Sequence, residues 1–335
     1  MRSVLSTFNF DKGVREDKPS NLRKKKKDSS KIAFTFRTVL GGNSRSKEQG
    51  AFLYSEIDIE APDLIELLKE VITREGEYPG VGWEGQKVNM IGPFAPIVHF
   101  WEELNEQAVA REGDSAERVQ AREDLKELLE WVKGAEENET YFKTREQNLR
   151  SKTTTFDKLW TIFRPRTKVF AKPCMGMPQI FEIETPPEAW RNPKEIFVSC
   201  WFWDWIGDKL ARSSMRFRID KFRGTKDINS LPCYPLKYYR DDQGKYSGDE
   251  LMERLRVRGE RFCQLNRAKR GADQMFEYNG YEALLHDRSV LVLYHYSLCI
   301  QLLMSVRINP RMALQLRAKR KTNPNLRHQR LEQEG

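Results

Sequence analysis

The stretch IFVSCWFWDWIGDKLARSSMRFRI, residues 196–219, decides the fold. Its first part, 196–205, is apolar and β-branched or aromatic, which is typical of a long strand, and Ile206–Lys209 supplies a turn. In the second part the side chains alternate, with Ala211, Ser213, Met215, Phe217 and Ile219 on one face and Arg212, Ser214, Arg216 and Arg218 on the other. This alternation predicts a half-buried antiparallel strand.

Short strand patterns flank this hairpin. Val169–Phe170 and Ile180–Ile183 read as further strands, and Ser247 with Glu250 forms a capping box that predicts the start of a helix. Several short strands with close turns are typical of a small barrel or a strongly bent sheet. Residues 151–285 are therefore predicted to form a β-rich, small-barrel-like domain that is closed by a helix.

The preceding part, residues 31–150, alternates strand and helix signals. Ile32–Val39 and Phe52–Ile59 read as a hairpin with a long loop. Helices are expected over residues 62–72, 97–110 and 116–133, and the polar segment 135–151 reads as a connector. The predicted fold class for the whole chain is α+β.

Both ends of the chain are basic. Residues 1–31 and 307–335 each carry a net charge of +6, which leaves −3 of the total of +9 for the body. Residues 1–30 lack periodicity and are predicted to be a disordered basic arm, in which Arg23, Lys24, Lys25, Lys26 and Lys27 resemble a nuclear import signal. Such arms could bind nucleic acid through phosphate contacts.

Residues 286–335 combine an apolar segment with a basic tail and stay unassigned. The uncharged run Val290–Val306 would span about 25 Å as a helix, which is short of a bilayer core and makes a membrane partner improbable. No apolar signal region opens the chain, so the protein is expected inside the cell, in the cytoplasm or the nucleus.

The sequence offers no recognisable catalytic, cofactor or metal site. Its five cysteines are widely spaced, lack a Cys-x-x-Cys pair and read as small buried hydrophobes. Gly80–Gly85 matches G-x-G-x-x-G, but neither a strand before it nor a helix start after it fits the nucleotide fingerprint, so a plain turn is expected. Asp204 and Asp208 read as turn formers. We therefore expect no enzyme activity and no cofactor.

One set of residues could form a ligand or partner surface. Trp201, Trp203 and Trp205 share a strand face, which favours packing against a covering helix, although an exposed aromatic platform is the alternative. Arg212, Arg216 and Arg218 would lie beside them across the hairpin and would suit an acidic ligand.

Several motifs resemble the region of unknown function that precedes the AAA+ module in a group of filamentous-fungal ATPases. They lie at residues 78–81, 93–97, 159–165, 175–179, 200–208, 219–224, 228–236 and 258–262. The resemblance covers roughly residues 50–285. It departs at Arg166–Thr167, where the family usually has Gly-Asp after the proline, and this chain has no phosphate-binding loop.

The resemblance implies a non-catalytic recognition or assembly domain. In such ATPases this segment would contact a substrate or an adaptor protein, so a protein partner is expected. The alternative is a nucleic-acid-associated protein that binds through its basic N- and C-terminal arms.

Overall fold

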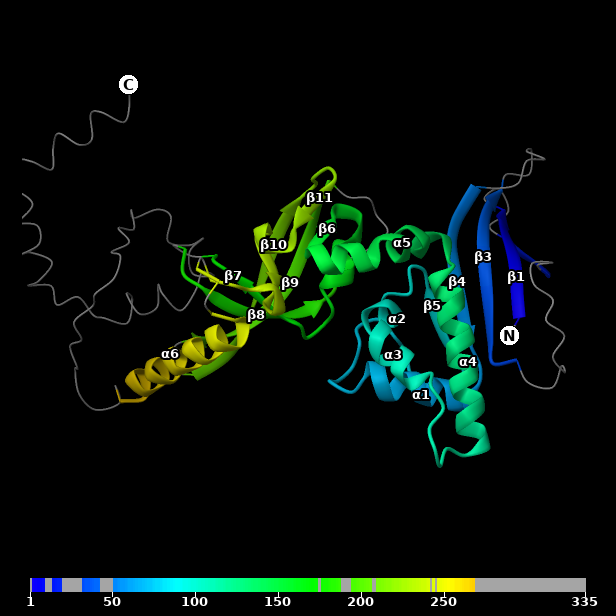
Figure 1. Ribbon diagram of the computed structural model, residues 1–335, viewed down its shortest axis with the longest axis horizontal. Coiled ribbons are helices and arrows are strands. Elements are labelled where there is room, and N and C mark those ends of the chain that lie inside the picture. Colours follow the sequence, from blue (N-terminus) through cyan, green and yellow to red (C-terminus); the bar gives the residue numbers. More distant parts are fainter. Residues whose placement is uncertain are drawn as a thin grey trace, which may run out of the picture. The chain divides into compact units, whose positions relative to one another are not determined.

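The computed structural model describes residues 2–9, 14–19, 32–42, 51–173, 176–187, 194–206, 209–241, 243–244 and 246–268. The chain divides into two compact units. The larger one comprises Met1–Lys172, Pro178–Phe202 and Ser213–Arg254, and the smaller one Pro173–Met177, Trp203–Arg212 and Leu255–Gly335. Helices and sheets are both abundant, which confirms the predicted α+β class (Figure 1).

The first sheet has the strand order β2-β1-β3-β4-β5. Its strands are β1 (Arg2–Asn9), β2 (Val14–Pro19), β3 (Phe34–Gly42), β4 (Ala51–Ile59) and β5 (Val88–Ile91). β3 and β4 pair antiparallel, which confirms the predicted hairpin. β1 pairs antiparallel with β2 and parallel with β3. The prediction of a disordered arm over residues 1–30 is therefore wrong for β1 and β2. Residues 20–31, with the lysine run, lie outside the described residues.

Five helices accompany this sheet, and in Figure 1 helices α1 and α4 lie on the same side of β3 and β4. Their bounds are α1 Pro62–Ile72, α2 Ala95–His99, α3 Trp101–Gln107, α4 Ala116–Lys133 and α5 Glu136–Ser151. The predicted helices over 62–72 and 116–133 are confirmed. The helix predicted over 97–110 is instead two short helices separated by Phe100, whose ψ of 27° is not helical.

The segment predicted as a connector, 135–151, is helix α5. The sequence did not predict this helix because the helix has no apolar stripe, and Asn138 is its only buried residue. Three glutamates in its first turn stabilise the helix, because negative charges interact favourably with the positive end of the helix dipole. The side chain of Asn138 donates to Pro93 O at 2.9 Å, and Glu137 accepts from Ser55 N at 2.6 Å, so polar contacts hold this helix in place.

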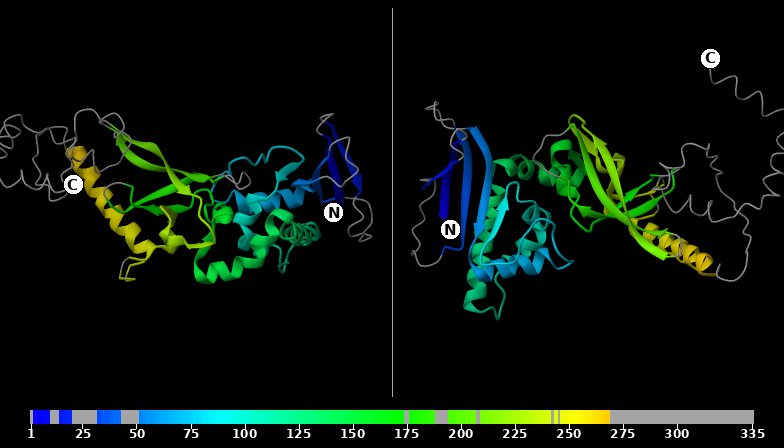
Figure 2. Two further views of the ribbon diagram at one scale, coloured as in Figure 1. Left: turned by 90° about the horizontal axis from the view of Figure 1, so that it is seen from above. Right: turned by 180° about the vertical axis from the view of Figure 1, so that it is seen from behind.

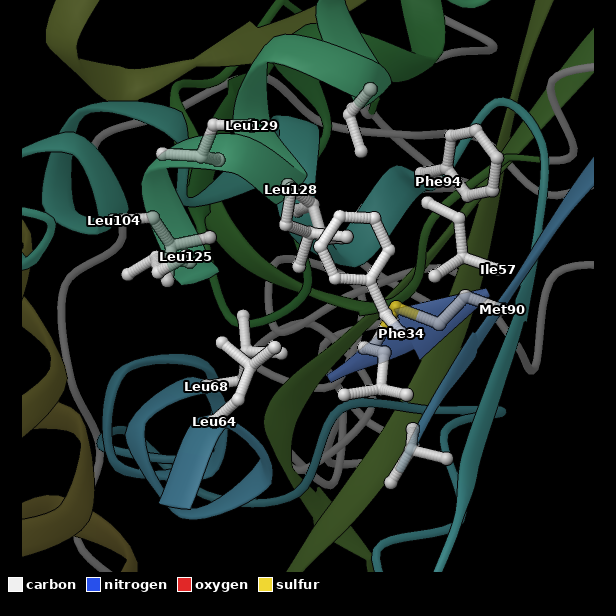
Figure 3. Close-up of a cluster of buried hydrophobic side chains, with 14 of the residues drawn as sticks. Phe34, Ile57, Leu64, Leu68, Met90, Phe94, Leu104, Leu125, Leu128 and Leu129 are labelled. Carbon is white, nitrogen blue, oxygen red and sulfur yellow. The ribbon is translucent and has the colours of Figure 1, made fainter. Parts of the chain in front are cut away.

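The main core lies between the first sheet and its helices (Figure 3). Phe34 and Ile57 project from β3 and β4, and Leu64 and Leu68 from one face of α1, because helical side chains four residues apart share a face. Leu125, Leu128 and Leu129 of α4 complete the layer. The core also includes Trp160, which lies much further along the chain.

The second sheet has the order β10-β9-β8-β7-β12. Its strands are β7 (Lys168–Ala171), β8 (Gln179–Thr185), β9 (Glu195–Ile206), β10 (Lys209–Asp220) and β12 (Cys233–Pro235). It appears in green to yellow-green in Figure 2. Because β10 and β12 are its two ends and do not pair, the sheet is open, and the predicted barrel-like closure is wrong.

Short elements complete this region. β6 (Thr153–Thr155) pairs with β11 (Thr225–Asp227), and three 3-10 helices lie at η1 (Phe156–Ile162), η2 (Ile228–Ser230) and η3 (Leu236–Tyr238). Helix α6 (Gly248–Ala268) starts at the predicted capping box, in which Ser247 N donates to Glu250 Oε2 at 2.6 Å. Residues 269–335, which include the apolar run Val290–Val306, lie outside the described residues.

The turn after Pro165 contains a residue in the left-handed region. Arg166 has a φ of 64°, a value that favours glycine. Its backbone N–H donates to Ile183 O at 2.8 Å, and its guanidinium fills the space that a Cβ on Gly76 would need. Arg166 therefore holds a left-handed position in this turn and packs against Gly76.

Candidate recognition surface

The hairpin of β9 and β10 has one buried face. On β9 the buried side chains are Ile196, Val198, Cys200 and Phe202. On β10 they are the predicted Met215, Phe217 and Ile219, with the ring of Phe217 at 5.0 Å from that of Phe181. The alternation along β10 was therefore predicted correctly from the sequence.

The other face of the hairpin is exposed in the larger unit. Phe197 on β9 is 39% exposed although it is a large apolar residue, and Ser214, Arg216 and Arg218 on β10 are also exposed. We call Phe197, Ser214, Arg216 and Arg218 the outer face. A large exposed aromatic beside cations is a feature that packing alone does not require.

Arg216 is the central residue of the outer face. Its guanidinium carbon lies 4.8 Å from the centroid of the Phe197 ring, within range of a cation–π interaction. Within the part of the chain that the structure describes, no ion pair of Arg216 is found. The ring orients the guanidinium and leaves its donors available to an incoming carboxylate.

Arg218 differs, because it already has carboxylate partners. Its Nε lies 2.7 Å from Glu195 Oε2 and its Nη2 lies 2.7 Å from Asp220 Oδ1. The hydrogen bond to Asp220 and the two nearby charges raise the pKa of Arg218. A ligand would therefore reach Arg218 only by competing with these two carboxylates.

The three tryptophans do not share one environment. Trp201 is half-buried, whereas Trp203 is 54% exposed, so the predicted packing under a helix is wrong for Trp203. Trp203 and the exposed Arg212 belong to the smaller unit, and the side chain of Trp205 lies outside the described residues. The sequence favoured covered tryptophans because aromatic residues usually dominate protein cores.

The first sheet also has a charged face, but its charges pair with one another. The cations Arg15, Arg37 and Lys87 pair with the carboxylates of Asp17, Glu56 and Asp58, and these residues lie on β2, β3 and β4 and directly before β5. Asp58 is 3% exposed; it contacts Arg37, accepts from Asn89 Nδ2 at 2.9 Å and lies 2.7 Å from Lys87 Nζ. We call these six residues the paired ladder. Burial raises the pKa of Asp58, but the hydrogen bonds from Lys87, Asn89 and Arg37 outweigh it, and the net pKa is lowered.

The half-buried His99 connects η1 to the main core. His99 Nε2 lies 2.8 Å from Trp160 O, which can only accept, so Nε2 carries the proton. His99 Nδ1 then accepts from the hydroxyl of Tyr78 at 2.8 Å. Burial lowers the pKa of His99 to about 4, so the ring is neutral at physiological pH.

Arg164 makes a second connection to the main core. Its guanidinium lies 4.3 Å from the Phe100 ring and pairs with Glu103 at 2.8 Å and Glu75 at 3.0 Å. Trp160 and Arg164 therefore contact residues 75–103, and sequence reasoning did not predict these connections. The one available signal in the sequence was His99 itself, because the chain has only four histidines.

A groove of about 1030 Å³ lies between α1 and the loop before β5, and it too was not predicted. It is lined by Ile65, Glu66, Lys69, Trp83 and Lys87, among others. The loop contains Gly80 and Gly85 at φ values of 82° and 125°, and a strand follows it where the nucleotide fingerprint requires the start of a helix.

The remaining candidates from the sequence are the two aspartates near the hairpin turn and the cysteines. Asp204 is buried, and Asp208 lies outside the described residues. Cys200 and Cys233 are free and buried, and burial raises the pKa of Cys200 to about 12, as expected for thiols that act as hydrophobes. In the described ranges no three metal-ligating side chains gather, and no helix there is long and apolar enough to cross a bilayer.

The comparisons with known proteins give one match. Residues 144–240 match a family described as a domain of unknown function (DUF7025), a segment that runs from within α5 to the end of η3 and includes the outer face. Neither curated proteins nor solved structures gave a match. Residues 144–240 are thus similar to the DUF7025 family, and Trp160 and Arg164 within this segment contact residues that precede it.

Proposed function

We propose that this protein is a non-catalytic recognition module that binds a partner protein through the outer face of β9 and β10. The observation that supports it is the pairing of Arg216 with the exposed Phe197 ring at 4.8 Å. Aromatic residues and arginine are the types enriched at interface hot spots, because they combine a large contact area with directed hydrogen bonds.

The resemblance to the region before the AAA+ module of fungal ATPases extends this proposal. In it, the module would present a substrate or an adaptor to an ATPase, while the chain itself hydrolyses nothing. A cation that is oriented by a ring is suited to such a contact, because it recognises carboxylates without reacting with them.

Selection of peptides from a random display library against the full chain tests the proposal. The double variant Phe197→Ala, Arg216→Glu serves as the competitor that removes other binders. We expect enriched peptides to bind the wild-type chain at least about tenfold more tightly than the double variant. Peptides that bind both proteins equally would contradict the proposed surface.

A second candidate function is nucleic-acid binding through the basic ends. It is favoured by the run Arg23–Lys27 and by the net charge of +6 on residues 307–335. Because β1 and β2 belong to the first sheet, deleting residues 1–31 would damage the fold. Replacing Arg23–Lys27 with glutamine in the full chain is the cleaner test, and we expect a weaker affinity and a shallower dependence on salt. An unchanged salt dependence would contradict a role for this run.

A further inference from the structure

We propose that β10 is a docking edge for an extended acidic peptide, which adds to the second sheet as one more strand. This inference rests on the proposed function and specifies its ligand and its geometry. The segment concerned is Ser213–Asp220, which belongs to the larger unit.

The first support is the position of β10 in the sheet. It is the terminal strand in the order β10-β9-β8-β7-β12, and within the described residues its one neighbour is β9. A terminal strand presents a row of backbone N–H and C=O groups that can pair with an added strand. Strand addition is a common way to bind peptides, in which the main chain supplies affinity and alternate side chains supply specificity.

The second support is the charge pattern of this edge. Arg216 and Arg218 are two residues apart on the outer face, which separates them by about 7 Å along the strand. A peptide strand with acidic residues at alternate positions repeats at the same distance. Its first contact would be Arg216, because Arg218 already pairs with Glu195 and Asp220.

The same charges argue against a second copy of this chain as the occupant. An antiparallel pair of β10 strands would bring their arginines close together, and like charges that face each other across strands are destabilising. Charged side chains on edge strands serve in many proteins to prevent such self-pairing. The arginines therefore disfavour self-association and favour an acidic partner.

The test uses a peptide of about eight residues in which glutamate alternates with valine, labelled for fluorescence anisotropy and titrated with the full chain. We expect binding that weakens by about tenfold or more in Arg216→Glu. The matched control is Arg254→Glu, because Arg254 is also exposed and stacks on a ring, that of Tyr246, at 5.2 Å. This control should keep its affinity, and both variants should keep the wild-type unfolding midpoint.

Two further peptides test strand addition itself. In an antiparallel or parallel added strand, alternate backbone N–H groups point toward the edge and the others point away. The peptides have the same sequence but carry N-methyl groups on alternate residues, in one phase or the other. We expect one phase to lose about tenfold or more in affinity and the other to bind like the parent peptide.

The results with these peptides and variants distinguish strand addition, the acidic ligand and the proposed function from one another. Equal affinity of the two methylated peptides, with a loss in Arg216→Glu, would overturn strand addition and leave the proposed function intact. Failure of the parent peptide to bind, or equal binding to Arg216→Glu, would overturn the acidic peptide as the ligand. Binding of oligothymidylate that depends on Arg216, without peptide binding, would replace the peptide with a nucleic acid. The library selection, in contrast, tests the proposed function for any peptide.

Discussion

The two sheets each carry arginines on a polar face, but the arginines are used differently. In the first sheet Arg15 and Arg37 meet buried carboxylates of β4 at Glu56 and Asp58. In the second sheet Arg216 stacks on an exposed phenylalanine, and Arg218 pairs only with exposed or half-buried carboxylates. Charge on a sheet is therefore no guide to binding by itself; the partner that each charge already has distinguishes structural pairing from a surface available to a ligand.

The largest effect is expected on the buried side of the second sheet. Phe217→Ala should lower the free energy of unfolding by about 3–5 kcal/mol, because it removes a buried ring that packs on Phe181. Denaturant unfolding followed by fluorescence measures the change. An unchanged midpoint would show that Phe217 is not on the inner face and would break the distinction between the two faces of β10.

The next effect concerns the paired ladder. Asp58→Asn should lower the free energy of unfolding by about 3 kcal/mol, because it leaves Arg37 without its most buried carboxylate partner. Arg216→Gln is the matched change in the second sheet and should alter stability by less than about 0.5 kcal/mol. If the two variants are equally stable, the ladder is not a structural network and the contrast between the sheets fails.

The dependence of stability on pH distinguishes His99 from Asp58. The pKa of His99 is lowered to about 4 from 6.5, so its contribution is complete above pH 6.5 and is lost as pH falls toward 4. This shift corresponds to about 3 kcal/mol. The pKa of Asp58 is lowered from 3.8, so its contribution is lost only below that value. His99→Gln should flatten the dependence of stability on pH between 6.5 and 4 and leave the loss at lower pH. If the variant loses stability between pH 6.5 and 4 as steeply as the wild type, the lowered pKa of His99 is contradicted.

The smallest effect on stability is expected at the outer face. Phe197→Ala should change the free energy of unfolding by less than about 1 kcal/mol, because the ring is already 39% exposed. The same variant should weaken binding of library-selected peptides by about tenfold. A loss of stability as large as that of Phe217→Ala would show that the outer face is part of the core.

Local patterns allowed much of the fold to be predicted. The hairpin of β3 and β4, the helices α1 and α4 and the inner face of β10 follow from apolar periods of two or about 3.6 residues. Helix α5 has no such period and is held by Asn138 and Glu137, while β1 depends on parallel pairing with a strand distant in sequence. Contacts of this kind leave no local signal.

The candidate surface was only half predicted. Arg212, Arg216 and Arg218 were predicted correctly to lie on an exposed face, but the tryptophans were expected to be covered, whereas Trp203 is 54% exposed. Which face of a sheet is covered depends on elements elsewhere in the chain. The contacts of Trp160 and Arg164 with residues 75–103 could not be predicted for the same reason.

Hydrogen exchange with and without the alternating glutamate–valine peptide tests the recognition surface most directly, because added backbone hydrogen bonds slow the exchange of the amides that they involve. We predict slower exchange in Ser213–Asp220 on addition of the peptide, and no change in β3 and β4 of the first sheet. Protection in β3 and β4 without protection in Ser213–Asp220 would contradict the claim and place binding on the paired ladder instead.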